Sequence, residues 1–184
     1  MEATVRTARP GDICILLEPA QDGTSFLHER QLALQALFGG RPHETVHLTC
    51  QRFDARGQTE SHIIQRLRTA FAAIRPFPII AASLVQFYSP FWETHLLRWS
   101  IQNTTAFQRC RTVIQSTLTE LGITAHYPPE RVPLVTALED IPAVSLDDHL
   151  RGMVFPHQLF IARQVVLSRI KGPREFDVLD RLTL

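Results

Sequence analysis

The feature that most constrains the fold is a unit that occurs once in each half of the 184-residue chain. Each unit has a helical segment, then a loop, then a short extended segment in which polar and apolar side chains alternate. The extended segment spans residues 46–50 (VHLTC) in the first unit and residues 133–137 (PLVTA) in the second. Because side chains on a strand alternate between two faces, the two segments present similar faces. The repeat predicts two equivalent strands side by side across a cleft.

The rest of the chain alternates between helical and extended periodicity. Ile63, Leu67 and Phe71 recur at helical spacing, and residues 12–18 form an apolar run beside prolines, which is typical of a buried strand. No low-complexity linker interrupts the order, so we expect a single domain over residues 1–184. The expected helices are 25–38, 58–74, 104–121 and a short one at 146–150. The expected strands are 12–18, 45–53, 79–88, 94–101, 132–138 and 160–169, and residues 175–184 form a last strand or an extended tail.

The first extended segment carries the best candidate site residue. His47 and Thr49 fall on one face of the expected strand, and Val46, Leu48 and Cys50 fall on the other. A site that handles phosphate needs a proton carrier and a hydrogen-bond donor a few ångströms apart, and these two polar residues supply both. The alternative is that they belong to the solvated face of a half-buried sheet.

Composition argues against several functional classes. The net charge is +1, which provides no electrostatic basis for binding long duplex DNA. The three cysteines lie apart in apolar settings, as expected for free thiols in a reducing compartment. The histidines form no metal-binding motif, and no apolar run is long enough to span a membrane. We expect a cytoplasmic monomer with no metal, no cofactor and no membrane association.

Several local features follow one another in a defined order. They are the strand that ends in His47-Leu48-Thr49, the helix followed by Pro76-Phe77-Pro78, the helix that ends at Leu121-Gly122, and the closing strand with its Gly172-Pro173 turn. In this order and spacing, nearly the whole chain resembles the 2H phosphoesterase superfamily, which includes 2′-5′ RNA ligase-like proteins and RNA 2′,3′-cyclic phosphodiesterases. The resemblance implies an α+β fold of two pseudo-symmetric lobes of antiparallel sheet, with helices outside and a central cleft.

The resemblance also implies a mechanism. That family carries two His-x-Thr/Ser motifs, one in each lobe. One histidine acts as general base, the other as general acid, and the threonines donate hydrogen bonds to phosphate oxygens. The first motif lies in residues 46–50, and the second aligns within the strand expected at residues 132–138. His47 is then the expected catalytic residue, and Thr49 and Thr136 are the expected substrate-binding residues.

The second motif departs from the family pattern. Leu134 stands where the second histidine belongs, and the interval of 134 − 47 = 87 residues fits the spacing of the two motifs. An arginine often follows the second motif, but Glu139-Asp140 occupies that region here, and this acidic pair would repel a phosphate unless it points away. His126, in the preceding loop, and His157, in a Pro-His-x sequence, are the alternatives for the missing role.

Three functions are consistent with these residues. The protein binds a nucleotide or an RNA end without efficient turnover, or it is a slow 2′,3′-cyclic phosphodiesterase that uses His47 with a partner from outside the motif, or it is a scaffold for protein partners. Loss of one proton carrier costs about 10²–10⁴ in rate, so an active enzyme would be slow. Four aromatic residues are candidates for the rim of the cleft, although we expect the first of them to be packed in the core: Phe87, Tyr88, Phe91 and Tyr127.

Overall fold

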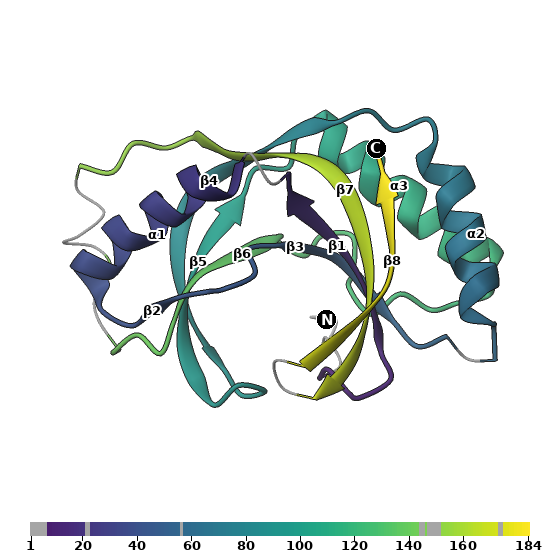
Figure 1. The fold of residues 1–184 in the computed structure, drawn as a ribbon, viewed down its shortest axis with the longest axis horizontal. Coiled ribbons are helices and arrows are strands. Elements are labelled where there is room, and N and C mark those ends of the chain that lie inside the picture. The colour runs from purple at the N-terminus through teal and green to yellow at the C-terminus, as the bar shows by residue number, and fades with distance from the viewer. Residues whose placement is uncertain (1–6, 21–22, 56, 144–145, 147–151, 173–174) are drawn as a thin grey trace.

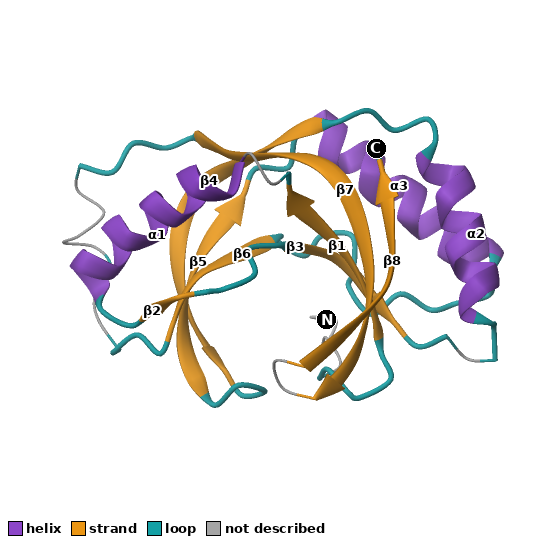
Figure 2. Cartoon of the chain, viewed as in Figure 1, coloured by secondary structure: helices purple, strands orange, loops and turns teal. Residues whose placement is uncertain are grey.

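The computed structural model describes the chain except for residues 1–6, 21–22, 56, 144–145, 147–151 and 173–174. It is an α+β fold, in which antiparallel strands form a curved sheet and the helices pack on its outer side (Figures 1 and 2). Helix α1 lies at one end of the molecule, and helices α2 and α3 lie together at the other (Figure 1). No helix in the described part is long and apolar enough to cross a membrane.

The elements follow the alternating order that the sequence predicts. The helices are α1 (Thr24–Phe38), α2 (Glu60–Phe71) and α3 (Thr105–Glu120). The strands are β1 (Ile13–Pro19), β2 (Arg41–Pro42), β3 (Leu48–Phe53), β4 (Phe77–Ser89), β5 (Thr94–Ile101), β6 (Leu134–Glu139), β7 (His157–Gly172) and β8 (Glu175–Thr183). The short strand β2 was not predicted, and the helix expected at 146–150 lies almost entirely outside the described residues.

The strand pairings close a ring. Strand β1 pairs with β3, β3 with β6, β6 with β5, β5 with β4, β4 with β7, and β7 again with β1, all of them antiparallel. The long strand β7 connects two parts of the sheet: its first part pairs with β4, and its second part pairs with β1 and β8. Strand β3, from the first half of the chain, meets β6, from the second half, where Leu48 pairs with Val135. The strands of the two motif-like segments are therefore neighbours.

The helices begin and end where local chemistry favours it. The Thr59 and Thr104 side chains accept hydrogen bonds from backbone amides in the first turns of α2 and α3. Helix α1 ends at Gly39, whose φ of 71° favours glycine. Its buried stripe is Leu27, Gln31, Leu34 and Phe38. Leu37 is not part of this stripe: its position one residue before Phe38 turns its side chain outward, and it is 52% exposed.

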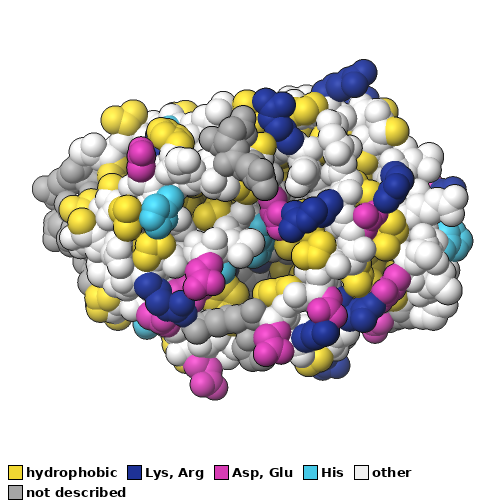
Figure 3. Space-filling view, in the orientation of Figure 1, with side chains coloured by type: hydrophobic (Ala, Val, Ile, Leu, Met, Phe, Trp, Pro, Cys, Tyr) yellow, Lys and Arg dark blue, Asp and Glu magenta, His cyan; other side chains and the backbone are white. Residues whose placement is uncertain are grey.

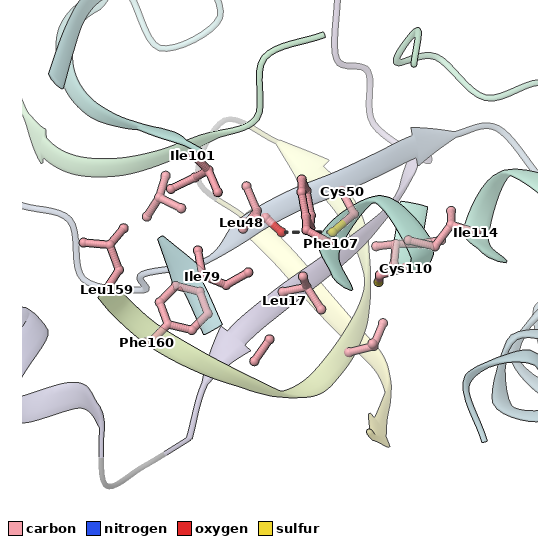
Figure 4. Packing of buried hydrophobic residues seen from close by; sticks show 14 of the residues in the cluster. Leu17, Leu48, Cys50, Ile79, Ile101, Phe107, Cys110, Ile114, Leu159 and Phe160 are labelled. Atoms are coloured by element: carbon pink, nitrogen blue, oxygen red, sulfur yellow. Dashed lines mark hydrogen bonds between the residues drawn. The ribbon is translucent and has the colours of Figure 1, made fainter. Parts of the chain in front are cut away.

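The main core lies between the sheet and the helices. Figure 4 shows side chains from β1, β3, β4 and β7 packed with residues of α3, among them Leu17, Leu48, Ile79, Phe107 and Phe160. The three cysteines are free thiols and are buried, as their apolar settings predicted. This burial of large apolar side chains holds the helices on one face of the sheet and leaves the other face available for a site.

A β-bulge decides which side chains of β3 face away from this core. Ile15 pairs with Gln51, but the next residue, Leu16, pairs with Thr49, so Cys50 is an extra residue in β3. Regular alternation would put Gln51 on the same face as Thr49. The bulge instead places Arg52 on that face and turns Gln51 to the other. The strand also begins later than predicted, at Leu48, so that His47 immediately precedes it.

Candidate functional site

A cleft of about 540 Å³ opens on the face of the sheet opposite the main core. All three expected site residues, His47, Thr49 and Thr136, line this cleft. The other main lining residues are Cys14, Leu16, Arg52, Phe87, Phe91, Trp92, Arg98, Tyr127, Arg131, Val132, Leu134, Ile170 and Phe176. Figure 3 shows histidine, acidic and basic side chains gathered around a hollow near the middle of one face of the molecule.

The imidazole of His47 has a defined tautomer. Its Nδ1 lies 2.8 Å from the backbone oxygen of Thr45. A carbonyl oxygen only accepts hydrogen bonds, so Nδ1 is the donor and Nε2 of the neutral ring carries the free lone pair. Burial lowers the pKa of His47 to about 4, and the neighbouring His43 adds to the decrease. At neutral pH, His47 is therefore an uncharged base.

The register between β3 and β6 determines which residues of the two motif-like segments are neighbours. Leu48 pairs with Val135, and both are fully buried on the core face. Antiparallel alternation on either side of this pair puts His47 beside Thr136 and Thr49 beside Leu134. The two threonines thus do not face one another directly. The strand β5 continues the cleft face, because Arg98 pairs with Thr136.

Three arginines that the sequence analysis missed line the same cleft: Arg52, Arg98 and Arg131. Burial lowers the pKa of Arg98 to about 10, with Arg131 adding to the decrease, so the group remains charged at neutral pH. Within the described residues, Arg98 Nε is buried without a hydrogen-bond partner. Guanidinium groups bind carboxylate and phosphate oxygens through paired N–H donors, so the cleft suits an anion.

Aromatic rings accompany these guanidinium groups. The Arg131 guanidinium lies 3.5 Å from the centroid of the Tyr127 ring, and that of Arg98 lies 4.8 Å from the Phe87 ring. Phe87 is 42% exposed, so the expectation of core packing was wrong for this residue. Phe91 also lines the cleft, whereas Tyr88 packs against His95 with ring centroids 5.1 Å apart.

Gln51 explains how the loop that carries Tyr127 is held. The Gln51 amide donates to the Tyr127 carbonyl at 3.0 Å and accepts from the Tyr127 backbone amide at 2.8 Å. This pair of bonds mimics strand pairing and anchors the loop to the side of β3 that faces away from the cleft. The bulge at Cys50 therefore has two results: Gln51 positions the loop, and Arg52 lines the cleft beneath it.

A side chamber of about 470 Å³ continues from the cleft. Leu16, His47, Trp92 and Phe176 line both spaces, so His47 stands at the junction. The chamber is also lined by His43 and Glu139, and Nδ1 of His43 lies 2.5 Å from a carboxylate oxygen of Glu139.

The acidic pair expected to repel a phosphate is engaged in ion pairs. Arg41 contacts the Glu139 carboxylate at 2.5 Å and the Asp140 carboxylate at 2.6 Å. Glu139 and Arg41 line the side chamber and do not line the cleft that contains the three other arginines. The Arg41 guanidinium compensates negative charge at the pair, which reduces its effect on an anion near His47.

The two alternative histidines do not line the cleft. His126 is turned toward Asp12, with 4.0 Å between His126 Nδ1 and the carboxylate. His157 lies in a different groove, where its ring stacks on Phe155 at 4.9 Å and its Nδ1 contacts the Val154 carbonyl. Neither is placed to act together with His47.

Among the residues that the structure describes, no group of three or more His, Cys, Asp or Glu side chains is arranged to hold a metal ion.

No protein-family model and no curated protein matches the sequence. Solved structures do match. A structure described as a phosphoesterase has 17% identity and a TM-score of 0.62, and the match covers 96% of this chain and 99% of that one.

Two other matches are complexes with nucleotides. Escherichia coli LigT complexed with 3′-AMP is 14% identical, with a TM-score of 0.55 and coverage of 96% of this chain and 99% of that one. Kluyveromyces marxianus Usb1 with uridine monophosphate is 12% identical, with a TM-score of 0.55 and coverage of 95% and 99%. The chain shares the α+β fold of these structures. This similarity confirms the α+β architecture that the sequence resemblance implied.

Some residues of the cleft had a signal in the sequence and others did not. Arg98 alternates with Leu97 and Trp99 in a clear strand pattern, so its place on the polar face was readable from the sequence. Alternation of side chains along β3 did not indicate that Arg52 lines the cleft, because a bulge has no reliable signature in a single sequence. His43 and Arg131 lie in loops, and long-range packing alone brings them to the site.

Proposed function

We propose that the cleft binds a nucleotide or an RNA end through its phosphate and that the protein slowly hydrolyses a 2′,3′-cyclic phosphate or a 2′-5′ phosphodiester. The observation that carries the proposal is the position of His47. Its tautomer is set by the Thr45 carbonyl, and it lies beside Thr136 in the cleft that also contains Thr49 and Arg98. One base, two hydroxyl donors and fixed positive charge are the groups that phosphoryl transfer requires.

In this mechanism each group has one role. The Nε2 atom of His47 takes a proton from the attacking water. The hydroxyls of Thr49 and Thr136 donate hydrogen bonds to non-bridging phosphate oxygens, and Arg98 and Arg131 compensate the negative charge that develops on them. Because burial disfavours the Arg98 cation, a bound phosphate would restore the lost solvation and be held strongly.

The nucleotide part of the ligand is supported by two observations. Phe87 and Tyr127 line the cleft and offer faces for base stacking, each already paired with a guanidinium. Structures with the same fold contain 3′-AMP in LigT and uridine monophosphate in Usb1. No cofactor enters the proposed reaction, since water is the second reactant.

A second function, binding without turnover, is favoured by Leu134. This leucine lines the cleft beside Thr49, where the sequence resemblance expects the second motif histidine. An apolar side chain there neither donates a proton nor stabilises a dianion. On this alternative the protein is a catalytically inactive sensor or carrier of phosphate ends, and the same threonines and arginines bind the ligand.

A panel of 2′,3′-cyclic nucleotides and RNA with a cyclic phosphate end tests the proposal. The wild-type protein is expected to hydrolyse at least one of them, His47→Ala to lose that turnover, and His62→Ala, on an exposed face of α2, to retain it. Equal turnover by wild type and His47→Ala would overturn the proposal that the protein is an enzyme that uses His47. A phosphate-induced increase in melting temperature without turnover, which disappears in Thr49→Val/Thr136→Val, would establish the binding function instead.

A further inference from the structure

His43 is the histidine nearest to the candidate base. It follows β2, and the centroids of the His43 and His47 rings are 5.6 Å apart in an edge-to-face arrangement. The His43 side chain is only 11% exposed, yet it lines the side chamber together with His47. The centroid of the His43 ring also lies 5.5 Å from that of the Trp92 ring. A second imidazole therefore stands in the side chamber, next to His47, which lines both the chamber and the cleft.

Glu139 determines which nitrogen of His43 is available. The carboxylate, itself 5% exposed, lies 2.5 Å from Nδ1. An ionised carboxylate only accepts, so Nδ1 is the donor and Nε2 is the nitrogen that gains or loses the working proton. In the described part of the molecule, Nε2 is buried and makes no hydrogen bond. Buried polar atoms normally have partners, so an atom in this position is suited to bond with a ligand group.

The charges around His43 act in both directions. Burial lowers its pKa most, Arg98 and Arg41 lower it further, and the hydrogen bond and charge of Glu139 raise it. Arg41 also contacts Glu139 and keeps the carboxylate in place. His47 is the other titratable group beside the ring, and Glu18, Glu44 and Arg181 line the rest of the chamber. The net effect is a lowered pKa of His43, and Glu139 is the contact that opposes this decrease.

We propose that His43, oriented by Glu139, is the second proton carrier of the site, in the role for which the second motif offers Leu134. The inference rests on the proposed hydrolysis. Water loses a proton to Nε2 of His47 and its oxygen forms a bond to phosphorus. The bond between phosphorus and the ribose oxygen breaks, and that oxygen receives a proton from Nε2 of His43. The two rings then return to their initial states by exchanging protons with solvent.

The proposal differs from a structural role for His43 in its dependence on the leaving group. A ribose oxygen is a poor leaving group and needs a proton, whereas p-nitrophenolate leaves without one. His43→Gln is therefore expected to lower kcat/KM for a 2′,3′-cyclic nucleotide by about 10²-fold or more, and to change kcat/KM for a nucleoside p-nitrophenyl phosphodiester by less than about 3-fold. A general loss of packing or folding would lower both rates together.

The second variant, Glu139→Gln, keeps a hydrogen-bond acceptor but removes the charge that raises the pKa of His43. Its activity on the cyclic nucleotide is expected to decline at a lower pH than that of the wild type on the alkaline side of the profile, while the acid side remains. His62→Gln, on the exposed side of α2, is the matched control and should match wild type on both substrates.

The outcomes separate the two proposals. If His43→Gln affects both substrates equally, or neither, and Glu139→Gln leaves the alkaline side unmoved, the role of His43 is overturned, while inactivation by His47→Ala still supports the proposed function. If the wild type hydrolyses neither substrate, the proposed hydrolysis fails and this inference fails with it. Selective loss on the cyclic nucleotide, with both His43→Gln and wild type showing the same cooperative melting, supports His43 as the acid.

Discussion

Leu48 and Val135 are register partners at the point where β3 and β6 meet. Both side chains are fully buried in the core, so the pair is held by packing and not by any ligand. Since the strands are antiparallel, this pair sets His47 beside Thr136 and Thr49 beside Leu134 on the opposite face. A phosphate in the cleft is thus expected to contact groups from both halves of the chain.

Replacement of His47 by alanine is expected to lower the hydrolysis of a 2′,3′-cyclic nucleotide by about 10²–10⁴-fold, because the general base is lost. The arginines and threonines remain, so a nucleotide should still raise the melting temperature of the variant. Steady-state kinetics and thermal melting measure the two effects. A variant that loses both binding and activity would show that His47 acts in binding, contrary to the mechanism.

Leu134→His is expected to raise cyclic phosphodiesterase activity by about 10-fold or more, since it adds a proton carrier on the cleft face beside Thr49. Val132→His provides the matched control, because Val132 also lines the cleft but is 57% exposed and lies at its edge. The measurement is the hydrolysis rate of each variant on the same cyclic nucleotide, compared with wild type. No gain in Leu134→His, or the same gain in both variants, would contradict the expectation that a proton carrier at position 134 assists the reaction.

Arg98→Met is expected to separate stability from binding. Removing a buried cation whose Nε has no partner in the described structure should raise the free energy of unfolding without ligand by about 1–2 kcal/mol. The same change should abolish most of the stabilisation by phosphate, since an anion-binding charge is lost. Urea denaturation with and without phosphate measures both. Arg109→Met, at an exposed position on α3, should change neither quantity appreciably.

The stability of the protein should fall as the solution becomes acidic. Burial lowers the pKa of His47 from 6.5 to about 4 in the folded protein, while the unfolded chain keeps the ordinary value. Between these values the unfolded state binds more protons, so the free energy of unfolding decreases as the pH falls through this window. With allowance for solvent screening of a half-buried ring, we expect about 1–2 kcal/mol from His47.

Urea denaturation at pH 7 and at pH 4.5 measures this loss. Burial also lowers the pKa of His43, which contributes in the same direction, so His47→Asn should reduce the pH dependence without removing it. The same decrease in His47→Asn and wild type would be inconsistent with a depressed pKa at this position.

Much of the architecture was predictable because its causes are local. Threonines before α2 and α3 cap helices whichever sheet they pack on, and Gly39 ends α1 through its positive φ. Periodicity likewise located β5 at residues 94–101, as observed. Periodicity does not determine every side chain of a helix: Leu37 is apolar and lies beside the buried stripe of α1, yet it is exposed.

By itself, the sequence determined the order of the main elements and placed His47, Thr49 and Thr136 in or directly beside two similar strands, because alternation of side chains depends only on neighbouring residues. Tertiary structure decided which other groups share their cleft. The bulge at Cys50 exchanged Gln51 for Arg52, since one extra residue reverses the faces of all that follow. Pairing of distant strands brought Glu139 to His43, a contact across 96 residues that no local pattern encodes.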